Sequence, residues 1–117
     1  MLPSDSNVPA CGERRQAERH HCRPDVFCQV VDLLDESATD AGPWNLSRSG
    51  ICVLVEPQYR PGAHLEVQFL KPDAGPSLHL FAEVVHTLLV PSLREMYLTG
   101  CAVHGEPLSE ETLQPWI

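Results

Sequence analysis

The sequence predicts a mainly β protein of about six strands, an antiparallel barrel or sandwich, with a flexible N-terminal arm and a short C-terminal helix. Strand-like segments of alternating polar and apolar residues recur at short spacing, with no helical pattern between them. Eleven prolines among 117 residues favour turns and short elements. The composition, 43% hydrophobic and 21% charged, is typical of one folded domain with a single core.

The strand pattern begins after Pro24 and continues almost to the C-terminus. The expected strands are 26–34, a short one around 43–47, 50–56, 64–70, 77–90 and 95–104. The segment "GICVLVE" is the clearest, because Ile51, Val53 and Val55 fall on one face. The segment 35–42, "DESATDAG", has the composition of a loop. Ser109 is the expected N-cap of a helix that Pro115 limits to a turn or two.

The chain divides into an arginine-rich arm, 1–24, and a β domain, 25–117. The arm has no periodic apolar pattern, so we expect it to be flexible. No run of eighteen apolar residues occurs, and the polar N-terminus lacks the apolar segment of a signal peptide. We therefore expect a cytoplasmic protein that does not insert into a membrane.

Several function classes are disfavoured by composition. The formal net charge of -8 disfavours binding of DNA or RNA. The five cysteines contain no C-x-x-C pair and are expected to be reduced thiols, and "HHC" at 20–22 is too compact for a metal site. No nucleophile, base and orienting acid form a recognisable arrangement. We expect no catalytic residue, no metal and no cofactor.

Two short motifs remain. Arg15 and Arg19 form R-x-x-x-R, and Asn45, Ser47 and Gly50 form N-x-S-x-x-G directly before the strongest strand. Taken alone, the first is typical of a solvated segment and the second of a polar turn. Together, on a small β protein, they resemble the PilZ domain family over about residues 13–114, and the resemblance implies a small six-stranded antiparallel β-barrel. PilZ domains are receptors for the bacterial second messenger cyclic di-GMP, with the arginine arm folded over ligand on the outer face of the barrel.

The resemblance implies a set of ligand-binding residues and a partner. The implied site comprises Arg14, Arg15, Arg19, Asn45, Ser47 and Gly50, with Arg48 and Trp44 as further candidates. Arginine suits a dianion with two guanines, because a guanidinium can grip phosphate, pair with the guanine edge and stack on the base. Asn45 stands where the family often has aspartate, which implies weaker guanine binding.

Arg14 makes the chain similar to members that bind two stacked cyclic di-GMP molecules. The expected function is a receptor that passes the signal to an unidentified downstream protein. Two alternatives stay open at this point: a PilZ-like protein-interaction adaptor that does not bind nucleotide, and a small hydrolase or metal protein on the same barrel.

Overall fold

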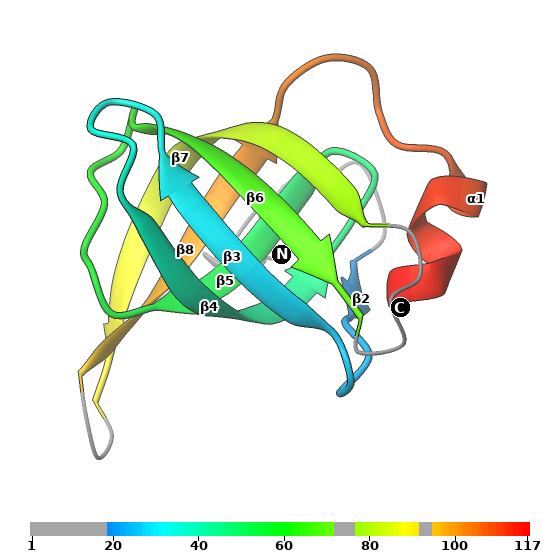
Figure 1. The fold of residues 1–117 in the computed structure, drawn as a ribbon, viewed down its shortest axis with the longest axis horizontal. Helices are drawn as coiled ribbons and strands as arrows, with labels where there is room; N and C mark the ends of the chain where they lie inside the picture. Colours follow the sequence, from blue (N-terminus) through cyan, green and yellow to red (C-terminus); the bar gives the residue numbers. More distant parts are fainter. Residues whose placement is uncertain (1–18, 72–76, 92–94) are drawn as a thin grey trace, which may run out of the picture.

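The computed structural model describes residues 19–71, 77–91 and 95–117, which form a closed antiparallel β-barrel with a short helix at one end (Figure 1). Its strands are β2 (His20–His21), β3 (Phe27–Asp32), β4 (Ala38–Leu46), β5 (Gly50–Val55), β6 (His64–Leu70), β7 (Leu78–Val90) and β8 (Met96–Val103). Helix α1 (Glu110–Leu113) and the 3-10 helix η1 (Gln114–Trp116) follow. The predicted six-stranded barrel with one short C-terminal helix is thereby confirmed.

The barrel closes because β4 pairs with both β3 and β5. The strand order is β4-β3-β6-β7-β8-β5, and β4 also pairs with β5. The first part of β4, 38–41, lies against β3, and the second part, from Gly42 to Leu46, lies against β5. The two-residue strand β2 pairs with β4 at Asn45 and Leu46. The β4–β5 hairpin therefore lies where the barrel closes, and it also lies beside the N-terminal segment.

The core follows the alternation of the strands. Leu65, Val67 and Phe69 of β6 are fully buried, while Glu66 and Gln68 between them point outward and are only partly buried. At one end of the barrel, the C-terminal elements contribute Leu113 and Trp116 to the core, and the Trp116 ring meets Phe69 edge-on at 5.7 Å. Ser109 caps α1 as expected, since its hydroxyl accepts from the Thr112 N–H.

Part of the segment read as a loop is strand. Residues 38–42 belong to β4, and the strand expected around 43–47 is the end of this nine-residue element. The polar composition of 35–42 was misleading, because residues 38–42 form a strand by pairing with neighbouring strands. The tendency of a residue to lie in a strand depends strongly on such neighbours. Residues 1–18 of the predicted arm lie outside the described residues, and the division at residue 24 stays a prediction. No helix in the described part of the chain has the length and apolar character to cross a membrane.

Candidate binding site at the β4–β5 hairpin

Ser47 builds the turn between β4 and β5. Its Oγ accepts from the Gly50 N–H at 3.0 Å and from the Ser49 N–H at 3.3 Å, and the Ser47 N–H donates to the Gly50 carbonyl at 2.9 Å. The side chain is buried. A hydroxyl that accepts from two backbone N–H groups stabilises a tight turn. The serine of N-x-S-x-x-G therefore has a structural role here.

Arg19 and Asn45 are brought into direct contact. The Arg19 Nη1 donates to the Asn45 Oδ1 at 2.7 Å, across 26 residues of sequence. The neighbouring strand β2 explains the contact, because His20 lies opposite Leu46 and His21 opposite Asn45. The second arginine of R-x-x-x-R therefore lies over the N-x-S-x-x-G hairpin in the free protein.

Gly50 leaves the space that this arrangement needs. A Cβ at position 50 would lie 3.2 Å from the Cys101 carbonyl oxygen, 3.7 Å from the Ser47 Oγ and 3.8 Å from the Arg19 Nη2. The first of these distances is tighter than an ordinary van der Waals contact. The absence of a side chain at residue 50 thus lets the turn, strand β8 and the guanidinium approach one another closely.

A β-bulge shapes the rim of the site. The β4–β5 register shifts between Pro43 and Asn45, so Trp44 has no direct partner in β5. Trp44 is 45% exposed and meets the His21 ring edge-on at 6.3 Å. The indole is therefore exposed beside the hairpin, and a direct ligand contact of Trp44 stays a prediction. Gly42 and Pro43, which directly precede Trp44, are residue types that often accompany bulges in strands.

Arg48 is held by the C-terminal segment. Its Nε donates to the Leu108 carbonyl at 2.8 Å, and the Leu108 N–H donates to the Arg48 carbonyl at 2.7 Å. This exposed arginine therefore ties the hairpin to the connection before α1. A direct ligand contact of Arg48 remains a prediction.

The structure unites part of the predicted site. Arg19, Asn45, Ser47 and Gly50 lie together at the hairpin. Arg14 and Arg15 lie outside the described residues, and their roles stay predictions.

Two buried thiols, Cys28 and Cys101, and the partly buried thiol of Cys22 stay protonated at neutral pH. Burial raises the pKa of Cys22 from 9.0 to about 11, and those of Cys28 and Cys101 to about 12. Such thiols are poor nucleophiles and poor metal ligands. Cys52, by contrast, is disulfide-bonded, so the expectation that all five cysteines are reduced was wrong.

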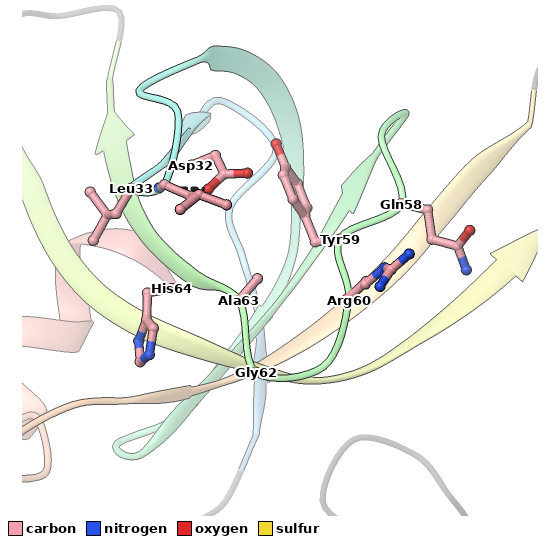
Figure 2. Close-up of a pocket in the computed structure, with 9 residues that line it drawn as sticks. Asp32, Leu33, Gln58, Tyr59, Arg60, Gly62, Ala63 and His64 are labelled. Carbon is pink, nitrogen blue, oxygen red and sulfur yellow. Dashed lines mark hydrogen bonds between the residues drawn. The ribbon is translucent and has the colours of Figure 1, made fainter.

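A second concavity lies at the other end of β5. Figure 2 shows this pocket, with a volume of about 570 Å³, between the turn after β3 and the connection 56–63. Its lining is mainly apolar, although Asp32 and Arg60 contribute charge. A six-residue strand such as β5 spans roughly 20 Å, which separates this pocket from Gly50 and the hairpin. Sequence reasoning did not find it, because its lining residues carry no motif.

The fold and the hairpin define the chain as a small β-barrel domain in which an arginine from the N-terminal segment lies over an N-x-S-x-x-G turn. The chain belongs to the PilZ domain family, whose sequence profile matches residues 13–115. No curated protein matches it in sequence.

Solved structures with the same fold include proteins determined with cyclic di-GMP. The PilZ domain of YcgR from Escherichia coli with cyclic di-GMP is 13% identical, with a TM-score of 0.65, over 87% of this chain and 85% of that one. MrkH of K. pneumoniae in complex with cyclic di-GMP is 15% identical, with a TM-score of 0.63, over 79% of this chain and 45% of that one. MotI of Bacillus subtilis, an inhibitor of motility, is 17% identical, with a TM-score of 0.58, over 87% of this chain and 46% of that one. At such identities the likeness establishes a shared fold.

Proposed function

We propose that this PilZ domain is a receptor for cyclic di-GMP, bound on the outer face of the barrel at the β4–β5 hairpin. The observation that carries the proposal is the 2.7 Å hydrogen bond from the Arg19 Nη1 to the Asn45 Oδ1, made above a glycine that leaves room for it. The two family motifs thus meet at one surface site.

The chemistry of these groups suits the ligand. Cyclic di-GMP has two anionic phosphodiesters and two guanines, and a guanidinium can bind phosphate oxygens or the O6/N7 edge of guanine with paired N–H donors. The Asn45 amide oxygen can accept from the N1–H or N2–H₂ groups of a guanine. In the free protein this oxygen accepts from Arg19, so ligand binding would exchange an internal hydrogen bond for contacts with the nucleotide.

The N-terminal segment supplies the rest of the proposed mechanism. Arg14 and Arg15 precede Arg19 by only a few residues, and several guanidinium groups favour a dianion in spite of the net charge of -8. We assign Arg14 to a second, stacked ligand molecule. Ordering of the arm around the ligand would change the surface beside the hairpin, which is the proposed signal to a downstream protein.

Calorimetric titration with cyclic di-GMP tests the proposal, with GTP and cyclic di-AMP as control ligands. Charge-assisted hydrogen bonds contribute roughly 1.5 to 3 kcal/mol, so Arg15→Ala and Arg19→Ala should each weaken binding at least about tenfold. Arg60→Ala is the matched control, because this arginine lines the pocket at the far end of β5.

The outcomes separate the alternatives. Wild-type affinity in both arginine variants would contradict the assigned site. A folded wild-type protein that takes up no cyclic di-GMP would favour an adaptor that works through protein contacts alone. The end point of the titration gives the stoichiometry, which should be about two ligands per chain and should fall to one in Arg14→Ala.

A further inference from the structure

We propose that His64, Glu83 and His104 form a binding site for a divalent transition metal ion, with Zn²⁺ as the best fit. Each residue offers one ligand atom, and these three atoms lie within 4.8 Å of one another. None of the three residues belongs to the β4–β5 hairpin, so the proposal does not rest on the proposed cyclic di-GMP function.

The sheet register brings the three side chains together. His64 at the start of β6 lies directly opposite Glu83 in β7, and Glu83 lies opposite Ala102 in β8. His104 is two residues beyond Ala102, and its N–H donates to the Phe81 carbonyl at 2.8 Å. Opposite and diagonal neighbours on one face of a sheet are within reach of each other's side chains. Three adjacent chain segments therefore contribute one ligand each.

The spacing of the two histidines matches tetrahedral coordination. The His104 Nε2 lies 3.3 Å from the His64 Nδ1, and the rings are stacked with 5.4 Å between centroids. Two nitrogens bound to Zn²⁺ at about 2.0–2.1 Å with a tetrahedral angle are separated by about 3.3–3.4 Å. The distance between the nitrogens therefore fits binding of one ion, and side-chain rotations of the two imidazoles and of the partly buried Glu83 carboxylate would direct all three ligand atoms toward it.

The donor set indicates the class of ion. Two imidazole nitrogens and one carboxylate oxygen suit Zn²⁺ and its neighbours in the first transition series, whereas Mg²⁺ and Ca²⁺ prefer oxygen ligands. His64 and His104 are exposed, so an ion can enter from solvent and keep water in its fourth position. In Figure 2 the His64 imidazole, at the edge of the pocket, points away from Tyr59.

The ion would link the barrel to the C-terminal connection. His104 begins the segment between β8 and α1, and Leu108 in the same segment holds Arg48 of the β4–β5 hairpin. An ion bound only by the folded chain stabilises that chain by mass action. Zn²⁺ should therefore raise the Tm of the protein.

His79 and Glu66 provide a matched control. These residues form a similar cross-strand pair in β7 and β6, with 3.0 Å between the His79 Nδ1 and the Glu66 Oε2. They offer one imidazole and one carboxylate, with Ser77 as the other hydrogen-bond partner of the ring. His79→Ala should leave Zn²⁺ affinity unchanged.

The experiment is calorimetric titration of the full chain, without a histidine tag, with ZnCl₂, together with visible absorption of the Co²⁺-loaded protein. Wild type should bind one equivalent, and Co²⁺ should show the intense bands of a four-coordinate site. Loss of a direct ligand should cost more than the roughly 10- to 100-fold that outer-shell changes cost, so His64→Ala and His104→Ala should each weaken Zn²⁺ binding beyond that range. Glu83→Gln should weaken it less, because an amide oxygen can still bind.

Circular dichroism establishes that each variant is folded, and His104→Gln replaces His104→Ala if the alanine variant is not. Absence of Zn²⁺ binding by the wild type would overturn the proposal. So would equal Zn²⁺ affinity in wild type, His64→Ala and His104→Ala, since the ion would then be held elsewhere, for example at the adjacent His20 and His21.

Discussion

At the scale of single residues, Gly50 is the point where three parts of the molecule meet. The turn at Ser47, the backbone of β8 at Cys101 and the guanidinium of Arg19 all approach it. The small size of the glycine matters, because a Cβ would lie only 3.2 Å from the Cys101 carbonyl oxygen. The glycine of the motif therefore indicates that backbone and ligand-binding side chains approach each other closely at this position.

Gly50→Ala should destabilise the fold and weaken cyclic di-GMP binding. The new Cβ would lie 3.2 Å from a backbone oxygen that cannot rotate away, and such overpacking costs roughly 1–3 kcal/mol. Gly42→Ala is the matched control, since its Cβ would meet only the Leu54 Cβ at an ordinary 3.7 Å. Urea unfolding should show a lower free energy of unfolding for Gly50→Ala alone. Equal loss in the two variants would contradict this account of the glycine.

At the scale of elements, the short strand β2 fixes where the N-terminal segment joins the barrel. It pairs with the end of β4, and beyond it the Arg23 N–H donates to the Trp116 carbonyl at 2.9 Å. The segment is thus anchored at both β4 and η1 before any ligand is present. Arg19 directly precedes β2 and already contacts Asn45, so we expect ligand-induced ordering in the arginine-rich segment upstream of it.

Hydrogen exchange can locate that ordering. Amides 12–19 should gain protection when cyclic di-GMP binds, because the arginines of this segment would close over the ligand. Amides 20–23 should change little, since β2 and its neighbours already contact the barrel. Strands β5 and β6 serve as internal controls and should stay as they were. The mechanism would be contradicted if amides 12–19 were protected without ligand, or if they stayed unprotected when the protein is saturated with cyclic di-GMP. Neither result would contradict cyclic di-GMP binding itself.

At the scale of the whole molecule, the sequence allowed most of the barrel to be predicted. Strands β5 and β6 were found because their apolar residues alternate strictly, as Val53 and Val67 illustrate. The first half of β4 was missed, because Thr39 and Asp40 are typical of loops and are held in a strand by their partners in β3. Alternation is a local property of the sequence, whereas pairing depends on segments far away.

The candidate sites differ in the same way. Asn45, Ser47 and Gly50 are close in sequence and could be predicted from their spacing. The cluster of His64, Glu83 and His104 could not, because its members are dispersed along the chain and meet only through the registers of β6, β7 and β8. The bulge at Trp44 was likewise missed, because Gly42 was interpreted as the end of a loop and Pro43 as the start of a separate short strand.

Buried thiols make the stability of the whole chain sensitive to alkaline pH. The pKa of Cys28 and of Cys101 rises from 9.0 to about 12, mainly because burial disfavours the thiolate. Above pH 9 the unfolded chain loses these protons while the folded chain keeps them, so the free energy of unfolding should fall as pH rises from about 9 towards about 12. Each thiol contributes a slope of at most about 1.4 kcal/mol per pH unit.

Urea unfolding at a series of pH values from 7.5 upward measures this slope directly. A variant with both Cys28→Ala and Cys101→Ala should be less stable at neutral pH, because two buried side chains are truncated, yet its stability should decline less steeply above pH 9. The slope, and not the neutral-pH value, reports the titration of the thiols. The partly exposed Cys22, whose pKa rises to about 11, should leave a smaller decline in the double variant. The same slope in both proteins would mean that other groups control the alkaline unfolding of the barrel.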